Sequence, residues 1–340
     1  MAAFVLVAGP IRLSYPKLMV FEGDIMGTAY HVQVLVPLWW RRERLERPLE
    51  ELLERQVMIF STYEPESELM GLNRDMTGLA RPVSEELYEV LVLSKALYHQ
   101  TRGAFDVTAK PLIDFWGIGE QDIQVQEWPS RSQLGPVLEL LGMDQIGLGR
   151  DGYVQKLAGS VHIDLSGIAK GYAVDQVAEW LLDQQMNDFM VEIGGEVRLS
   201  GQKGDRDWVI GVRWPGQHEM RPLMGLPLSD MSVATSGDYQ QQFVLDGTVY
   251  SHILDPRTGY PVLSDLVSIT VLAKQCALAD GVATALKVMG VEEGLSYVEQ
   301  RPEIEVFLVR REQDGGLVGV PSSGFPVSQA RFFEDVQILD

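Results

Sequence analysis

The alternation of apolar and polar residues along the chain predicts a mixture of strands and helices. Residues 30–36 alternate with a period of two, which is typical of a half-buried strand. Residues 41–60 and 84–100 place apolar side chains three and four positions apart, which predicts two amphipathic helices. Residues 121–133 are polar and follow neither period, so we expect a loop there.

A second group of elements surrounds a glycine-bearing turn at residues 166–171. Residues 162–165 and 189–193 have the composition of strands, and residues 172–185 carry one apolar stripe of helical spacing. A strand, a turn, a helix and a strand in this order predict a β-α-β crossover.

The last third of the chain repeats this combination of elements. Strands are predicted at residues 266–272 and 305–310. Two helices, at residues 277–289 and 292–300, are predicted between them.

Composition and charge place the chain among globular proteins and limit its ligands. Its 340 residues are 46% hydrophobic and 22% charged, enough for one large domain or two modest ones. The 28 Lys+Arg against 48 Asp+Glu give a formal net charge of -20, which disfavours nucleic-acid binding because it repels a phosphate backbone. A small anionic ligand is compatible with this charge if a divalent cation or a few basic side chains invert the local potential inside a cleft.

The single cysteine and the N-terminal residues bear on the cellular compartment of the protein. Cys276 excludes an intramolecular disulfide and a cysteine-rich zinc site. Residues 2–8 are apolar, but they are too few to span a membrane, no basic residue precedes them, and no lipid-acceptor cysteine follows. We expect a protein that stays in the cytoplasm, or one whose export segment is missing from the start of the sequence.

Two oxygen-bearing side chains lie one turn apart on the helix predicted at 277–289. Asp280 and Thr284 project from the same helix face, and hard cations such as magnesium take oxygen ligands. The alternative is that Asp280 caps the helix and Thr284 bonds back to a carbonyl of its own helix.

The turn that precedes the helix at 172–185 suits an anion. Its small residues feed a helix start, which offers free backbone N–H groups, and Lys170 adds a positive charge. These features outline a diphosphate site, although the segment is neither a Walker motif nor a dinucleotide glycine fingerprint. The alternative is a tight turn with an exposed lysine.

Residues 233–239 and 250–261 bring Ser, His, Asp and Arg side chains together in two turn-rich segments. No nucleophile elbow surrounds Ser236 or Ser251, so the pattern is not that of a hydrolase triad. The alternative is a β-hairpin over residues 243–253 followed by a plain turn. We accept the hairpin and expect His252 to act in the chemistry.

Aromatic residues beside a carboxylate suit a flat heteroaromatic ligand. Residues 103–108 combine Phe105 with Asp106, and Tyr63 lies in a loop where it could cover a ligand. Trp116 is expected to be a packing residue. Gly194 and its neighbour Gly195 would allow close approach of a ligand to the backbone, or form only a turn.

Taken together and in order, these segments resemble the ApbE family, the FAD:protein FMN transferases. The resemblance runs from residue 26 to about residue 300. The matching segments are Met26-Gly27-Thr28, Ser61-Thr62-Tyr63 with Pro65 and Ser67, Gly103 to Thr108, Asp164 to Asp175, Gly194-Gly195, Ser236 to Tyr239, Ser251 to Pro261, and Ala279 to Thr284.

The resemblance implies an α+β fold with a deep FAD cleft, formed by residues 26–310. Residues 1–25 would be a poorly ordered N-terminal segment, and residues 311–340 a C-terminal extension. By position, the flavin-nucleotide contacts would come from Met26, Tyr63, Ala104, Phe105, Asp106, Lys170, Gln176 and Leu254. Magnesium would meet the pyrophosphate, held by Asp280, Thr284 and the main-chain carbonyl of Ala173.

The resemblance also implies a reaction and a partner. A threonine or serine hydroxyl of a target flavoprotein subunit, such as one in a membrane redox complex, would attack the flavin-side phosphorus of FAD, and AMP would leave. We expect His252 to handle the hydroxyl proton, with Asp255 or Asp238 orienting it. Because Gram-negative members are usually exported, the resemblance favours the periplasmic face of the inner membrane.

Two other functions fit the same residues. A FAD pyrophosphatase would use water as the nucleophile and release free FMN and AMP. A non-catalytic flavin carrier would bind FAD and leave it intact with magnesium present.

Overall fold

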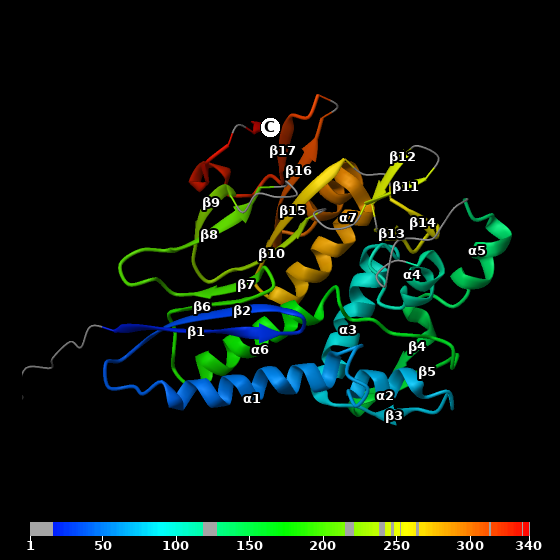
Figure 1. The fold of residues 1–340 in the computed structure, drawn as a ribbon, viewed down its shortest axis with the longest axis horizontal. Coiled ribbons are helices and arrows are strands. Elements are labelled where there is room, and N and C mark those ends of the chain that lie inside the picture. The colour runs from blue at the N-terminus through cyan, green and yellow to red at the C-terminus, as the bar shows by residue number, and fades with distance from the viewer. Residues whose placement is uncertain are drawn as a thin grey trace, which may run out of the picture.

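The computed structural model describes residues 16–117, 128–214, 221–237, 242–245, 248–251, 253–262, 265–312, 314–334 and 336–339. The fold is α+β, as expected, and a nine-stranded sheet forms its centre (Figure 1). In spatial order the strands are β1 (Lys17–Ile25), β2 (Thr28–Val36), β6 (Phe189–Ile193), β7 (Glu196–Ser200), β10 (Ser232–Gly237), β15 (Leu266–Ala273), β16 (Ile304–Arg311), β17 (Leu317–Pro321) and β19 (Gln337–Ile338). Neighbouring strands are antiparallel except β17 and β19.

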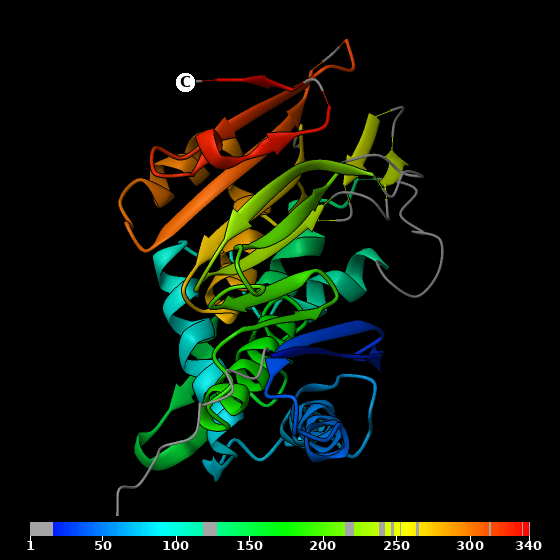
Figure 2. The same ribbon diagram turned by 90° about the vertical axis from the view of Figure 1, so that its left-hand side faces the viewer.

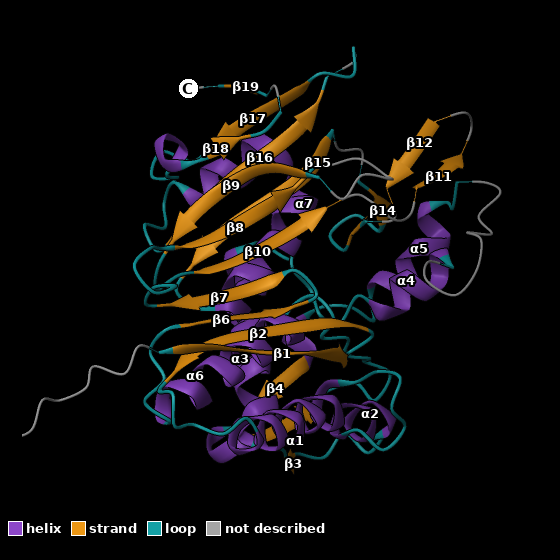
Figure 3. Ribbon diagram, turned by 60° about the vertical axis from the view of Figure 1, so that its left-hand side comes forward, coloured by secondary structure: helices purple, strands orange, loops and turns teal. Residues whose placement is uncertain are grey.

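Helices cover one face of this sheet, and a small sheet covers part of the other (Figure 3). The helices packed on the sheet are α1 (Glu43–Phe60), α6 (Ala169–Asp183) and α7 (Cys276–Val298), and α3 (Glu85–Gln100) packs against α1 and α7. The small sheet has the order β18 (Arg331–Phe332), β9 (Pro222–Leu228) and β8 (Trp208–Arg213). Buried apolar side chains fill both layers, so the large sheet lies between two cores.

Short elements lie around the ends of the large sheet. The remaining helices are α2 (Glu68–Arg74), α4 (Lys110–Trp116) and α5 (Arg131–Leu138). The remaining strands are β3 (Arg81–Pro82), β4 (Ile146–Leu148), β5 (Tyr153–Lys156), β11 (Gln242–Leu245), β12 (Thr248–Ser251), β13 (Leu254–Asp255) and β14 (Tyr260–Pro261). None of the helices in the described ranges is long and apolar enough to cross a membrane.

The periodic segments fold as predicted. The helices expected at 41–60 and 84–100 are α1 and α3, and Ser84 caps α3 by accepting a hydrogen bond from the Leu87 N–H. The two helices expected between 277 and 300 are segments of α7, separated at Gly290, where φ is 76°. The hairpin expected at 243–253 is β11 paired with β12. Residues 246–247 of its turn lie outside the described part.

The structure corrects the expectations for both ends of the chain, at the residues of each end that it describes. Residues 17–25, assigned to a poorly ordered segment, form β1 and pair along their whole length with β2. Residues beyond 310 form β17, β18 and β19, which extend both sheets. Figure 2 shows β1 and β2 at one end of the large sheet and β16 and β17 at the other. These ends are therefore parts of the two-sheet fold.

The predicted β-α-β crossover is wrong. Residues 162–165 form no strand, and the side chain of Asn73 supplies Ile163 with the hydrogen bonds that a neighbouring strand would supply. Its amide donates to the Ile163 carbonyl, and its carbonyl accepts from the Ile163 N–H, both at 2.8 Å. The strand after α6 is β6, which pairs antiparallel with β2 and β7.

The predicted loop at 121–133 is partly wrong. Helix α5 begins at Arg131, and Ser130 with Gln133 forms a capping box at its start. Residues 118–127 lie outside the described part.

A buried carboxylate on α6 holds the start of α7. Asp175 accepts hydrogen bonds from the N–H groups of Cys276 and Ala277 at 3.0 and 2.9 Å, and from Arg198 Nη1 at 2.9 Å. The residue before α7, Gln275, gives no side-chain cap. Asp175 therefore caps a helix that lies far along the chain from it.

We expect Asp175→Ala to lower the free energy of unfolding by about 3–5 kcal/mol, because it leaves two buried N–H groups without an acceptor and takes one of two carboxylates from the partly buried Arg198 guanidinium. Denaturant unfolding would measure the loss. The matched control is Glu179→Ala. Glu179 is the other partner of Arg198 and is 57% exposed, so its removal should cost less than about 1 kcal/mol. Equal losses for the two variants would contradict the capping role.

Candidate active site

Two cavities meet at the start of α6. The first, of about 370 Å³, lies between the β1–β2 turn, the end of α1 and the start of α6. The second, of about 260 Å³, lies between the loop before α4, the β12–β13 connection and α7. Asp164 and Ser166 line both cavities. Two adjoining chambers of this kind suit a ligand with two bulky groups and a linker between them.

Met26 and Tyr63, both predicted ligand contacts, line the first cavity. Met26 has φ 52°, and with Gly27 at φ 74° it forms the two-residue turn between β1 and β2. Such turns favour Asn or Asp before Gly, so a methionine here carries backbone strain. Tyr63 is 95% exposed. A strained residue and an open aromatic ring at one cavity are the features expected of a ligand-binding surface.

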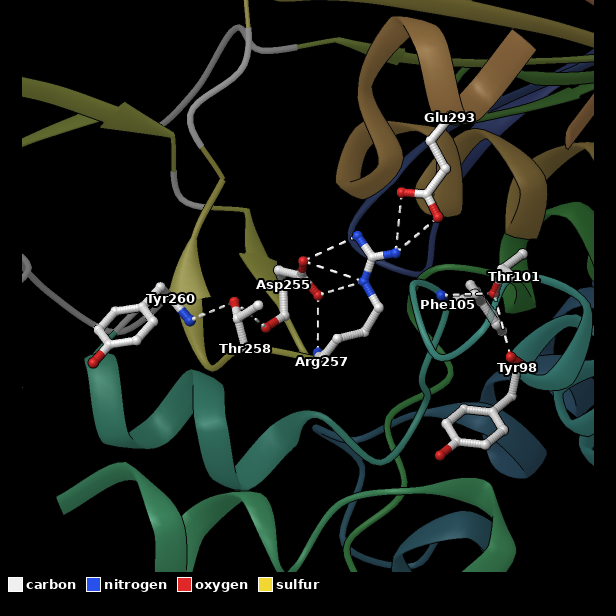
Figure 4. Close-up of polar contacts among 8 residues, drawn as sticks. All are labelled: Tyr98, Thr101, Phe105, Asp255, Arg257, Thr258, Tyr260 and Glu293. Carbon is white, nitrogen blue, oxygen red and sulfur yellow. Dashed lines mark hydrogen bonds and ion pairs between the residues drawn. The ribbon is translucent and has the colours of Figure 1, made fainter. Parts of the chain in front are cut away.

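The second cavity is lined by Ala104, Phe105, Asp106 and Leu254, all predicted contacts. The buried hydroxyl of Thr101, at the end of α3, accepts a hydrogen bond from the Phe105 N–H at 3.0 Å and fixes this loop (Figure 4).

Asp106 has an unusual environment for a carboxylate in this loop. Burial raises the pKa of Asp106 to about 6, although the Thr108 hydroxyl and N–H both donate to its Oδ1. The side chain is therefore ionised at neutral pH and can accept hydrogen bonds from a ring N–H.

The start of α6 lies where the two cavities adjoin. Gly167 lines the second cavity and Lys170 the first. Within the described ranges, the main-chain N–H groups of both residues have no hydrogen-bond acceptor. Unpaired N–H groups at a helix start bind anions, so a phosphate group suits this position.

Lys170 is not the exposed lysine of the alternative interpretation. Its Nζ lies 2.9 Å from Glu196 Oε1 and 3.8 Å from Asp280 Oδ2. Burial lowers the pKa of Lys170, but the two carboxylates outweigh burial and raise it. Burial and the charge of Asp280 also raise the pKa of Glu196, because two carboxylates share one cation. The group is acidic overall, which favours a further cation.

Asp280 and Thr284 face the start of α6. Asp280 is 3% exposed, and its Oδ2 accepts a hydrogen bond from the Gly171 N–H at 3.0 Å. Thr284 Oγ1 donates to the Gly167 carbonyl at 3.4 Å. The alternative interpretation of this pair is therefore wrong, because Asp280 does not cap α7 and Thr284 does not bond to its own helix.

The donors around Asp280 and Thr284 fit magnesium. They are a carboxylate, a hydroxyl and a main-chain carbonyl, all hard oxygen ligands, beside an acidic group that favours a cation. No cluster of three His, Cys, Asp or Glu side chains that could hold a metal occurs in the described ranges. Magnesium does not require one, because waters and substrate phosphates complete its shell.

Two predicted residues lie away from both cavities. Ala173 is buried inside α6 among the apolar residues against β2 and β6, and Gln176 is half-buried one turn later. Neither is among the described residues that line the cavities. The main-chain carbonyl that the structure places beside Thr284 is that of Gly167. Sequence reasoning missed this carbonyl, although Gly167 belongs to the turn that it selected.

Asp255 is engaged in an ion pair with Arg257. The guanidinium of Arg257 contacts both carboxylate oxygens of Asp255 at 2.9–3.2 Å and also binds Glu293 of α7 at 3.0 Å (Figure 4). These contacts tie the β13–β14 turn to α7. His252 and Asp238, which we expect in proton transfer, lie outside the described residues, so their roles stay predictions. Trp116 packs as expected, fully buried, and its Nε1 donates to the Gly259 carbonyl.

Comparison with known proteins identifies the family of the chain. The model of the ApbE family matches residues 26–308. The chain is 36% identical to the FAD:protein FMN transferase of Vibrio cholerae over 86% of this chain and 88% of that protein. It is 35% identical to the enzyme of the same name from Haemophilus influenzae, over 91% of each chain.

Solved structures agree with these sequence comparisons. The flavin transferase ApbE from Vibrio cholerae superposes with a TM-score of 0.80 at 35% identity, over 91% of this chain and 98% of that one. The apo form of the Pseudomonas stutzeri flavinyl transferase ApbE gives 0.82 at 31% identity, over 94% and 99% of the two chains. The fold, the order of the motifs and the relatives agree, and the chain belongs to the ApbE family.

Proposed function

We propose that this chain is an FAD:protein FMN transferase that needs magnesium, moves FMN from FAD to a threonine or serine hydroxyl of a target protein, and releases AMP. The observation that carries the proposal is the meeting of two ligand-sized cavities at the start of α6, beside the oxygen donors of Asp280 and Thr284. The names of the relatives from Vibrio cholerae and Haemophilus influenzae support the same activity.

FAD has two ring systems joined through a pyrophosphate, which matches the two cavities and the helix start between them. One ring would lie against Met26 and Tyr63, and the other against Phe105, Asp106 and Leu254. The pyrophosphate would then take hydrogen bonds from the Gly167 and Lys170 N–H groups, at the positive end of the helix dipole.

A magnesium ion bound to Asp280, Thr284 and the Gly167 carbonyl would neutralise charge that develops on the pyrophosphate oxygens. Lys170 lines the first cavity, and its ammonium would orient the same phosphates. The acceptor hydroxyl oxygen bonds to the phosphorus of the FMN half, the bond from that phosphorus to the bridging oxygen breaks, and AMP leaves. The hydroxyl proton goes to a base, for which we propose His252.

The test uses the purified chain with FAD, magnesium and a pooled library of short peptides, each with a single threonine or serine. We expect some peptides to gain the mass of FMN while AMP accumulates in equal amount. Free FMN and AMP with no modified peptide would select the pyrophosphatase. FAD that stays intact with magnesium present would select the non-catalytic carrier.

Asp106 gives a prediction with opposite effects on binding and stability. We expect Asp106→Asn to weaken FAD binding about ten- to a hundredfold at pH 7.5, because a charge-assisted hydrogen bond is lost. Fluorescence titration would measure this. The same variant should be more stable without ligand by up to about 2–3 kcal/mol at that pH, because a carboxylate with a pKa of about 6 must ionise in a buried site.

The sign of the stability effect follows from the raised pKa. The folded state of the parent holds a proton on Asp106 more tightly than the unfolded state does. The contribution of Asp106 to stability is therefore complete below about pH 4 and is lost as the pH rises through about 6. The advantage of the variant should vanish near pH 4. The control is Asp183→Asn on an exposed position of α6, which should change neither property. A parent-like affinity in Asp106→Asn would contradict the binding role.

A further inference from the structure

A third cavity, of about 550 Å³, lies on the face of the large sheet opposite α6 and α7. Its floor is formed by β6, the β6–β7 turn, β7 and β10, and its wall by β8. We call it the β8 groove. The lining residues are Met190, Glu192, Gly194, Gly195, Val197, Val209, Ile210, Gly211, Arg213, Val233, Thr235 and Gly237.

The floor of the groove has a gap between β7 and β10, because the two strands pair over only two residues. Only Ser232 and Val233 pair with β7, whereas β10 pairs with β15 along its whole length. In this register Thr235 would lie opposite Gly195, where β7 has already turned into β6. At this end the floor consists of Thr235, Gly237 and the glycines of the β6–β7 turn.

The wall presents an unpaired strand edge. Among the described residues, β8 pairs with β9 only and is the outer strand of the small sheet. Val209 and Arg213 lie opposite Pro227 and Pro222, which have no N–H, whereas the Trp214 N–H donates to the Arg221 carbonyl. In an antiparallel pair the bonded positions alternate. The N–H and carbonyl groups of Val209 and Gly211 therefore point away from β9, into the groove.

One end of the groove touches the candidate active site. Gly194 and Gly195 form the turn between β6 and β7, with φ 62° and 102°. A Cβ atom built on Gly194 would lie 3.3 Å from the Cδ of Lys170, which lines the first cavity. Around Gly195 no atom lies within 4 Å of such a Cβ. The turn is thus a thin partition between the groove and Lys170.

We propose that the β8 groove binds the acceptor segment of the target protein as an extended strand added to the free edge of β8. This inference rests on the proposed transfer of FMN to a protein. Strand addition takes its affinity from main-chain hydrogen bonds, which Val209 and Gly211 offer. The segment runs toward Gly195 and places its hydroxyl residue beyond the β6–β7 turn, beside Lys170.

The floor also indicates which acceptor side chains fit. Three floor positions are glycines, and Glu192 is already occupied by His31 at 2.6 Å and by the Gly195 N–H at 2.7 Å. A strand packed over these glycines meets backbone and no floor side chain, so the floor leaves room for the side chains on the face that meets the sheet.

The test uses a single new cysteine in the groove. The native Cys276 is fully buried, whereas Val209 is 63% exposed, so Val209→Cys gives one reactive thiol. The probe is the peptide from the library that the parent modifies fastest. At saturating concentration we expect this peptide to slow maleimide labelling of the Val209→Cys variant at least about tenfold. Once labelled, the variant should lose transfer to the peptide while binding FAD like the parent.

The control is Val92→Cys, the same change at a valine that is 44% exposed on α3. Its labelling should be unaffected by the peptide and should leave transfer unchanged. A further variant, Val209→Pro, removes the N–H that faces the groove and should raise the KM for the peptide at least about tenfold.

The outcomes separate the groove from the proposed function. If the parent modifies no peptide, the proposed transferase function is wrong, and the proposal for the groove is then wrong as well. If the parent transfers FMN but the peptide protects the thiols of Val209→Cys and Val92→Cys equally, the groove is not the acceptor site and the transferase function stands.

Discussion

Asp280→Asn is expected to lower the rate of FMN transfer at saturating FAD at least about a thousandfold, or about 4 kcal/mol in activation free energy. The variant removes the only charged donor of the proposed magnesium site. The amide can still accept the hydrogen bond from the Gly171 N–H, so the contact between α6 and α7 is kept. FAD affinity should fall less than the rate, because Met26, Tyr63 and Asp106 remain in place.

A binding measurement separates the metal role from a structural one. Magnesium should raise the melting temperature of the parent in the presence of FAD, and Asp280→Asn should lose this increase. Thr284 supplies a matched pair, since Thr284→Val removes the donor oxygen at nearly constant volume and Thr284→Ser keeps it. We expect the serine variant to bind magnesium and the valine variant to bind it weakly. If magnesium raises the melting temperature of Asp280→Asn as much as that of the parent, Asp280 is not a magnesium ligand.

The sequence predicted helices better than strand pairing, for a physical reason. The spacing of apolar residues in α1 and α3 is a local property of one helix face, so it can be read from the sequence. The partner of an extended segment is not local. Residues 162–165 resemble a strand, yet Ile163 takes its hydrogen bonds from the side chain of Asn73.

The candidate site also contains residues that local spacing predicts and residues that only the fold brings together. The helical spacing of Asp280 and Thr284 suggested a metal pair with a helix cap as the alternative, and the structure places both residues beside the start of α6. Glu196 was missed because it belongs to no motif near Lys170, and only the sheet brings the two together at 2.9 Å. Asp175 was missed as a cap because its helix is not the one it caps.

The contact between α6 and α7 depends on one glycine. A Cβ atom on Gly171 would lie 2.5 Å from the Cys276 carbonyl oxygen and 2.8 Å from the Cβ of Asp280. The first of these neighbours is backbone at the start of a helix, which cannot turn aside as a side chain can. Only glycine allows the two helix starts to approach this closely, and the approach puts Asp280 beside Lys170 and the Gly171 N–H.

Gly171→Ala is therefore expected to lower the free energy of unfolding by about 2–3 kcal/mol through overpacking. It should also slow FMN transfer about a hundredfold, the usual effect of moving a site group by about 1 Å. Thermal melts and transfer rates would measure both. The control is Gly71→Ala in α2, where a new Cβ meets no atom within 4 Å. The free energy of unfolding of that variant should rise by about 0.5–1 kcal/mol, because alanine favours the helix more than glycine does. If Gly171→Ala melts and transfers FMN like the parent, the metal donors do not need this close helix contact.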